Sequence, residues 1–301
     1  MSIFPTKILL ATDGSEDAAL AARVTTDIAT MTDSEVHILH ILELLPRYAY
    51  PEVTPEIYSL VHDERRRRAK ELLAWETERA RNEGANVVEV HLREGPIADE
   101  ILDASNELRV GLIVMGSRGL GRVKSLFLGS VSEGVAHHAQ HPLLVARGGE
   151  KAWPPERVVI GDDDSETATQ AGELAAAIAK PFGASGVLVR AFPKMPEIDA
   201  EGRSSNPRLV DDALRRAERD LEEQANKLEP TLGKRPRVRI AVGEPAATIL
   251  EAASESEETK TLIAMGSRGL GPIRRMRLGS VSTKVLKAAE GPVLVYPREA
   301  V

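Results

Sequence analysis

The sequence predicts two copies of a doubly wound α/β domain, each with a parallel sheet flanked by helices. Three observations carry this prediction. A long motif recurs at a fixed shift, short apolar runs alternate with helical stretches in each copy, and 301 residues is the length of two ordinary domains. Aromatic residues make up only 3% of the chain, so Val, Ile, Leu and Ala must fill the core, as they do where Ala-rich helices cover parallel strands.

An internal repeat sets the domain organisation. Three motifs occur twice, each at a shift of 150 residues. They are Met-Gly-Ser-Arg-Gly-Leu-Gly at 115–121 and 265–271, Leu-Gly-Ser-Val-Ser at 128–132 and 278–282, and Asp-x-Ser-Glu at 13–16 and 163–166. A period of 150 residues is too long for a solenoid unit. We therefore expect one domain duplicated, with residues 1–148 as the first copy, a linker at 149–156 and residues 157–301 as the second copy.

The first half begins with an apolar run at 7–11, which predicts a strand. The Ala-rich stretch 16–31 follows as a helix capped by Ser15 or Asp13. A second strand is predicted at 36–42, and three prolines interrupt the loop after it. A charged helix over 56–82 leads to a third strand at 87–92.

Gly95-Pro96 opens the next helix by placing proline in its first turn. The apolar runs at 110–115 and 143–146 predict the last two strands of the first half. The second half repeats the plan, with strands at 157–160, 187–191, 238–242, 262–265 and 293–296. Strands separated by helices imply parallel pairing, right-handed crossovers and helices on both faces of each sheet.

The loop after the fourth strand carries the pattern Gly-x2-Gly-x9-Gly-Ser, which occurs in both halves. Glycines at the end of a buried strand let a ligand approach bare N–H groups, and the Gly-Ser pair starts a helix whose N-terminus attracts anions, phosphate above all. Cations follow in both loops: Arg118, Arg122 and Lys124 in the first, and Arg268, Arg274, Arg275 and Arg277 in the second. The alternative is that these glycines only shape turns and that the cations are solvated.

These motifs, with an opening Ile-Leu-Leu-Ala-Thr-Asp-Gly-Ser, resemble the universal stress protein family in its tandem two-domain form and its ATP-binding branch. The resemblance covers almost all of both halves. It implies a five-stranded parallel sheet of order 3-2-1-4-5 in each copy, ATP held between strands one and four, and pairing through strand five. The implied nucleotide-binding residues of the first half are Asp13, Ile41, Met115, Gly116, Gly119, Gly129, Ser130, Val131 and Ser132. Those of the second half are Asp163, Ala191, Met265, Gly266, Gly269, Gly279, Ser280, Val281 and Ser282.

The second half departs from the first at two places. Ala191 stands where Ile41 stands, so the apolar wall beside the base is smaller. The first strand ends in Asp162-Asp163-Asp164, which repels a triphosphate unless a divalent cation such as Mg²⁺ accompanies it. Adjacent aspartates in such a turn more often cap a helix than bind a metal.

His137, His138 and His141 have no cysteine or matched carboxylate nearby, so no resident metal is expected.

Composition excludes several classes of protein. The net charge of −7 argues against coating nucleic acid, and the absence of cysteine excludes disulfides, iron–sulfur clusters and thiol catalysis. No apolar run approaches the ~18 residues of a membrane span, and the first residues show no signal-peptide pattern. We expect a cytoplasmic protein without a nucleic-acid or membrane partner.

Two functions from different classes remain. The first is an ATP-binding stress-response regulator with little or no turnover, whose halves pair as an internal pseudo-dimer and whose chains could form a homodimer. The second is an enzyme that uses the same adenosine site for slow ATP hydrolysis or for adenylyl or phosphoryl transfer. The Walker pattern Gly-x4-Gly-Lys-Ser/Thr is absent, and no general base is evident, which favours the regulator.

Overall fold

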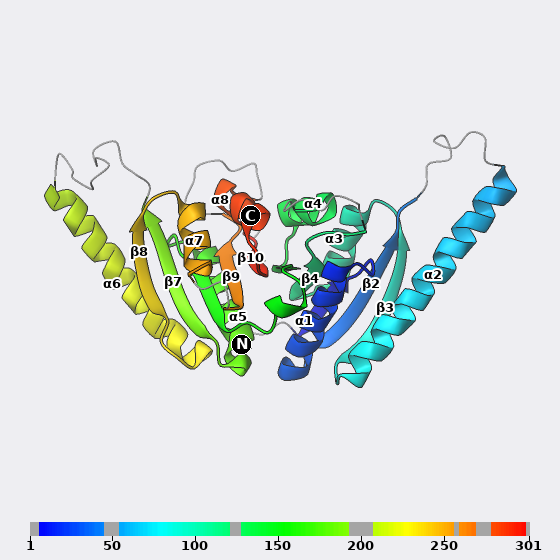
Figure 1. Ribbon diagram of the computed structural model, residues 1–301, viewed down its shortest axis with the longest axis horizontal. Helices are drawn as coiled ribbons and strands as arrows, with labels where there is room; N and C mark the ends of the chain where they lie inside the picture. The colour runs from blue at the N-terminus through cyan, green and yellow to red at the C-terminus, as the bar shows by residue number, and fades with distance from the viewer. Residues whose placement is uncertain are drawn as a thin grey trace. The chain divides into compact units, whose positions relative to one another are not determined.

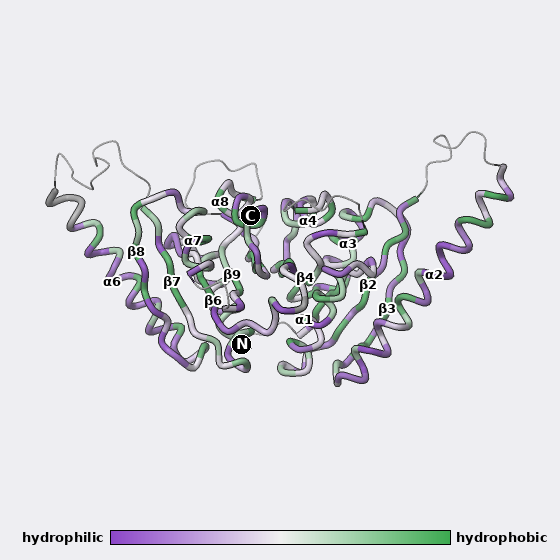
Figure 2. The backbone as a smooth tube through the Cα atoms, viewed as in Figure 1, coloured by the Kyte–Doolittle hydropathy of each residue, from purple (hydrophilic) through white to green (hydrophobic). Residues whose placement is uncertain are grey.

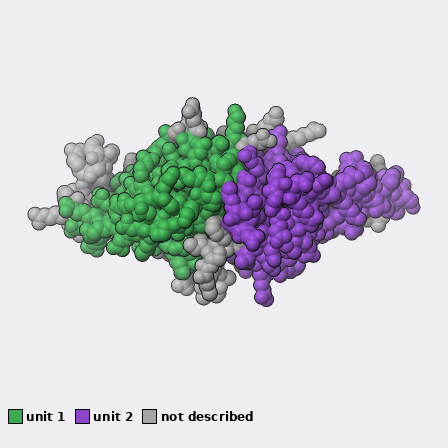
Figure 3. All heavy atoms as spheres, turned by 90° about the horizontal axis from the view of Figure 1, so that it is seen from below, with its two compact units in different colours: residues 1, 150–301 green, residues 2–149 purple. Residues whose placement is uncertain are grey.

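The chain alternates strands and helices in two compact units, formed by residues 2–149 and 150–301 (Figures 1 and 3). The computed structural model describes residues 6–44, 54–120, 128–192, 207–255, 259–268 and 278–298. Among the helices in these ranges, none is both long and apolar enough to cross a membrane.

The first unit, residues 2–149 (unit 2 in the key of Figure 3), is a parallel sheet of order β3-β2-β1-β4-β5. This is the predicted order 3-2-1-4-5, and the prediction of a doubly wound α/β fold is confirmed. The elements are β1 (Lys7–Ala11), α1 (Glu16–Thr32), β2 (Glu35–Leu42), α2 (Pro55–Asn82), β3 (Asn86–Glu94), α3 (Ile97–Leu108), β4 (Leu112–Gly116), α4 (Ser130–His138) and β5 (Leu143–Ala146).

The second unit repeats the plan with order β8-β7-β6-β9-β10, again with parallel pairing. Two short 3-10 turns, Glu150–Ala152 and Lys180–Phe182, accompany its regular elements. These are β6 (Arg157–Gly161), α5 (Glu166–Ala179), β7 (Ser185–Phe192), α6 (Pro207–Leu232), β8 (Arg237–Val242), α7 (Pro245–Ala253), β9 (Thr261–Gly266), α8 (Ser280–Ala288) and β10 (Val293–Tyr296).

The central strands are apolar and buried because helices cover both faces of each sheet. Ile8, Leu9 and Leu10 of β1 are buried, as are the side chains of β4 up to Met115. Helices α2 and α6 instead alternate hydrophilic and hydrophobic residues along their length, as expected of helices with one face in water (Figure 2). The polar turns at the carboxyl ends of the strands therefore follow directly after buried apolar strands.

Two boundaries differ from the sequence prediction for local reasons. Strand β4 begins at Leu112 rather than at residue 110, because Arg109 adopts the left-handed conformation (φ 51°) and the Val110 N–H donates to Ser105 O at 3.1 Å, which closes α3. Of the predicted linker 149–156, residues 150–156 belong to the second compact unit. Trp153 is buried there, edge-on to Phe182 with ring centroids 5.4 Å apart.

Candidate functional site

The carboxyl end of β1 turns tightly into α1. The Ser15 N–H donates to Asp13 Oδ1 at 3.0 Å, and Ser15 Oγ accepts a hydrogen bond from the Ala18 N–H at 3.3 Å as the N-cap of α1. Gly14, between them, has a φ of +77°, which favours glycine. Of the two caps that the sequence allows, Ser15 is the cap, and Asp13 supports the turn.

The start of the glycine loop after β4 lies against Asp13. The Leu120 N–H donates to Asp13 Oδ2 at 3.2 Å, and Ser15 Oγ donates to Arg118 O at 3.1 Å. A Cβ atom added to Gly119 would lie 2.5 Å from Asp13 Oδ2. The missing side chain at position 119 therefore makes room for the carboxylate, which the loop holds with a backbone N–H.

The other described glycines of this motif face the protein itself. A Cβ on Gly116 would lie 2.8 Å from the Ala18 backbone nitrogen, and one on Gly129 would lie 3.0 Å from Ser117 O. Close packing explains both glycines without a ligand, as the turn-shaping alternative expects. Met115, the strand residue before Gly116, is buried.

Helix α4 begins without a side-chain cap, because its N-cap residue is Gly129. The first intrahelical bond runs from the Glu133 N–H to Gly129 O at 2.9 Å. In the part of the chain that the structure describes, the N–H groups of Ser130, Val131 and Ser132 have no partner within the helix. N–H groups without an intrahelical partner, at the positive end of a helix, favour the binding of an anion.

The two serines of α4 face different ways. Ser130 is exposed, whereas Ser132 is buried and its Oγ donates to Ser117 O at 2.7 Å. The Ser132 hydroxyl therefore ties α4 to the end of β4, and its backbone N–H is the group that remains for an anion. Since a Cβ on Gly129 would lie 3.5 Å from Arg118 Cα, the helix start adjoins the same loop that holds Asp13.

Behind the turn, the buried Thr12 and Glu76 and the half-buried His40 link β1, β2 and α2. His40 Nδ1 lies 2.8 Å from Thr12 O, and Thr12 Oγ1 lies 3.5 Å from Glu76 Oε1. Burial raises the pKa of the Glu76 carboxyl, an effect that Arg79 opposes from 3.0 Å. Ile41, the neighbour of His40, is buried near the end of β2.

Asp17 is a site residue that the sequence does not reveal. It is buried, and its Oδ2 accepts hydrogen bonds from Ser117 Oγ at 2.6 Å and from Arg118 Nε at 3.1 Å. The bond to Asp17 raises the pKa of the Arg118 guanidinium. In sequence Asp17 is only an acidic residue at a helix start, and its partners are 100 residues away. It anchors the first cation of the glycine loop.

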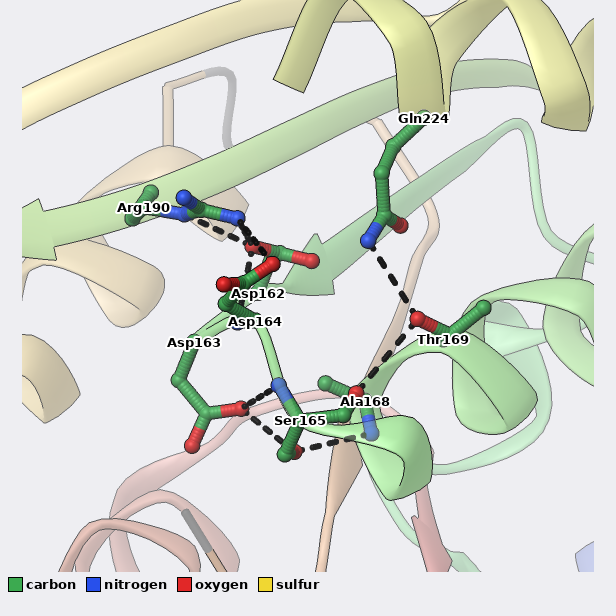
Figure 4. Close-up of polar contacts among 8 residues, drawn as sticks. All are labelled: Asp162, Asp163, Asp164, Ser165, Ala168, Thr169, Arg190 and Gln224. Atoms are coloured by element: carbon green, nitrogen blue, oxygen red, sulfur yellow. Dashed lines mark hydrogen bonds and ion pairs between the residues drawn. The ribbon is translucent and has the colours of Figure 1, made fainter. Parts of the chain in front are cut away.

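The strand end of the second unit is built differently (Figure 4). Asp162 occupies the position of Thr12, and Arg190 occupies that of His40. Arg190 Nε donates to the buried Asp162 Oδ1 at 2.7 Å, and Arg190 also lies 3.6 Å from Asp164. Burial raises the pKa of Asp162, while the guanidinium opposes this shift. The guanidinium thus neutralises the buried Asp162 and lies close to the exposed carboxylate of Asp164.

The third aspartate repeats the turn of the first unit. The Ser165 N–H and Ser165 Oγ both donate to Asp163 Oδ1, at 3.2 and 2.6 Å, and Ser165 caps α5 through the Ala168 N–H. Asp164 has a φ of +67° at the position of Gly14, so a side chain stands where the first unit has none. Ala191 is half-buried.

The glycines of the second unit also pack against protein. A Cβ on Gly266 would lie 2.5 Å from Thr167 Oγ1, and one on Gly279 would lie 3.2 Å from Ser267 O. Ser282 Oγ donates to Gly266 O at 2.9 Å, while Ser280 is exposed, Val281 half-buried and Met265 buried. Gly269 and the loop cations Arg122, Lys124, Arg274, Arg275 and Arg277 lie outside the described residues.

Comparisons with known proteins agree with this architecture. The Universal stress protein family matches twice, over residues 5–147 and 155–297. A universal stress protein of Mycobacterium tuberculosis is 32% identical over 210 residues, which span 67% of this chain and 62% of that protein. Another, from Mycobacterium bovis, is 25% identical over 96% of both chains.

A solved structure shows the same fold over the full length. The crystal structure of a universal stress protein from Archaeoglobus fulgidus covers 97% of this chain and 98% of its own, with a TM-score of 0.66 and 24% identity. The two family matches cover nearly the whole sequence, one in each compact unit. The chain therefore belongs to the universal stress protein family, as a tandem of two such domains.

Proposed function

We propose that the first unit binds ATP, at the carboxyl ends of β1 and β4, and that the protein acts as a stress-response regulator. The observation that carries the proposal is the contiguity of three features: the Asp13 carboxylate, the glycine loop at Gly119, and the uncapped start of α4. Ile41, near the end of β2, is the aliphatic side chain that we assign to the base.

The two polar ends of this site suit different parts of a nucleotide. A carboxylate repels phosphate but accepts hydrogen bonds from ribose hydroxyls, so Asp13 suits the sugar. The three free N–H groups of α4 suit phosphate. Arg118, fixed by Asp17, adds positive charge between them.

The surroundings support binding without rapid turnover. Hydrolysis needs a base that can take a proton from water. Three carboxylates around the β1 turn are already engaged: Asp13 accepts backbone N–H groups, Asp17 is buried against Ser117 and Arg118, and Glu76 is buried behind the turn. Mg²⁺ would arrive with the nucleotide.

A direct experiment separates this proposal from the enzyme alternative. Nucleotide bound to freshly purified protein would be identified by mass spectrometry, and stripped protein would be titrated calorimetrically with ATP, GTP and inorganic triphosphate. We expect ATP to bind most tightly and phosphate release to stay well below the roughly 1–1000 per second of ordinary enzymes. Saturable triphosphate binding without any nucleotide preference would refute the adenosine site, and a turnover within that range would establish the enzyme instead.

Assembly is a second part of the proposal. In each unit the last strand, β5 or β10, is terminal in that unit's sheet order, and an apolar edge strand favours pairing. We propose that the two units pair through these strands and that chains associate further. Light scattering tests the second part, since a monomeric mass at high concentration would exclude a homodimer.

A further inference from the structure

Two histidines and a glutamate converge on neighbouring strands, on the face of the sheet that carries α3. His37 lies in β2, and Glu89 and His91 lie in β3. An irregularity between Val36 and His37 sets the register, so that His37 stands beside Glu89 with His91 two residues further on the same face. This cluster is separate from the carboxyl-end turn described above and rests on none of the nucleotide proposal.

The two histidine nitrogens are spaced as they would be around one metal ion, and the glutamate oxygen lies slightly further away. His37 Nδ1 and His91 Nε2 lie 3.2 Å apart. Two nitrogens bound to one tetrahedral Zn²⁺ at about 2.0–2.1 Å are about 3.3 Å apart, so the pair already has the required spacing. Glu89 Oε2 lies 4.0 Å from His37 Nδ1 and 3.8 Å from His91 Nε2. Its side chain is 59% exposed and can rotate the short remaining distance.

Burial keeps the two rings ready to coordinate. The side chain of His37 is 5% exposed and that of His91 is 13% exposed. Burial lowers the pKa of both imidazoles, which favours the neutral rings that can coordinate a metal ion. The nearby charges nearly balance: Glu35, Glu89 and Glu107 against Lys7 and Arg93.

We propose that His37, His91 and Glu89 bind a divalent transition-metal ion, with Zn²⁺ as the best match. Two imidazoles and one carboxylate are ligands that zinc takes in proteins, and three protein ligands leave a fourth position for water. The exposed Glu89 gives the ion a route from solvent. The second unit has Val187 at the position of His37, so the site belongs to the first unit alone.

The experiment is a titration of metal-free full-length protein with Zn²⁺ in competition with a chromophoric chelator. We expect one ion per chain rather than two. His91→Gln should remove this binding, and Glu89→Gln, a change at an exposed side chain, should weaken it by about tenfold or more. His62→Gln is the matched control, because His62 pairs with Glu94 at 3.3 Å and belongs to no such trio in the part of the chain described.

A second readout excludes a folding artefact. Co²⁺ bound by these ligands should give the visible absorption of a tetrahedral site, which His91→Gln abolishes and His62→Gln preserves. Circular dichroism would confirm that the variants are folded. Absence of saturable binding at one ion per chain, or binding that survives both His91→Gln and Glu89→Gln, would overturn the proposal and leave the two rings as a hydrogen-bonded pair.

Discussion

At the scale of single residues, position 119 is where a substitution tests the proposed ligand site most directly. Gly116 and Gly129 are explained by backbone contacts, whereas a side chain at 119 would meet the Asp13 carboxylate. Asp13 is in turn fixed by the N–H groups of Ser15 and Leu120. A substitution at 119 therefore acts on the carboxylate that we assign to the sugar, with little effect on the packing of α1 or α4.

We predict that Gly119→Glu weakens ATP binding in the first unit by about a hundredfold or more, since its side chain displaces Asp13 and its charge repels phosphate. Leu120→Glu is the control: it adds the same charge one residue later, on a side chain that is 74% exposed. Calorimetric titration of stripped protein measures both. Equal affinities for Gly119→Glu and the parent would mean that the loop only forms a turn.

Arg190 is the corresponding key residue of the second unit, because it neutralises the buried Asp162. We predict that Arg190→Met destabilises this unit by roughly 3–5 kcal/mol, the cost of leaving one charge of a buried pair alone. Denaturant unfolding in a Trp75→Phe background reports the second unit through buried Trp153. The double change Asp162→Thr with Arg190→His, which installs the residues of the first unit, should recover most of the loss. An unchanged midpoint for Arg190→Met would show that the pair contributes nothing.

At the scale of elements, the sequence predicts most of the fold because apolar runs and helix caps are local signals. Strand β3 ends at Glu94 and β4 begins at Leu112, each two residues later than predicted, because long-range strand pairing and the closure of α3 decide these boundaries. The site is less predictable. Contacts such as Asp17 with Ser117, or His37 with His91, join residues 100 and 54 positions apart, and only the folded sheet brings them together.

The β2–β3 pair should make the first unit sensitive to acid. The folded pKa values of His37 and His91 lie below the ordinary 6.5, so the unfolded chain takes up protons first as the pH falls. The stability that these neutral rings provide is complete above about pH 6.5 and is lost as the pH falls toward their folded pKa values. Charges that face the rings also shift these pKa values: two cations lower them and three carboxylates raise them. These groups are Lys7 and Arg93, and Glu35, Glu89 and Glu107.

We predict that His37→Val, which installs the residue type of Val187, reduces this acid sensitivity. The measurement is the urea midpoint at pH 7.5 and at pH 5.5, with EDTA present so that no metal contributes. His40→Gln, a change three residues further along β2, serves as the control. An identical loss of stability on acidification in the parent and in His37→Val would show that His37 does not cause the acid sensitivity.

At the scale of the whole molecule, the chain is a duplication whose halves share a fold but differ in the residues at the carboxyl end of the first strand. Both keep the Asp–Ser turn and the uncapped helix after the glycine loop. Four residues of the first, Thr12, Gly14, His40 and Ile41, are replaced in the second by Asp162, Asp164, Arg190 and Ala191. Those changes place two more carboxylates and an arginine at the strand end, and they remove apolar surface beside it.

We therefore predict that one chain binds close to one ATP, held by the first unit. The second unit should bind much more weakly, because Asp164 adds a side chain and a charge where Gly14 has neither. Calorimetry on stripped full-length protein should give a stoichiometry near one, and Gly119→Glu should abolish it. In an Asp164→Gly, Ala191→Ile variant, which restores two first-unit residues, the stoichiometry should rise toward two. A parent that binds two equivalents with equal affinity would show that the carboxylates around Arg190 do not obstruct the second site.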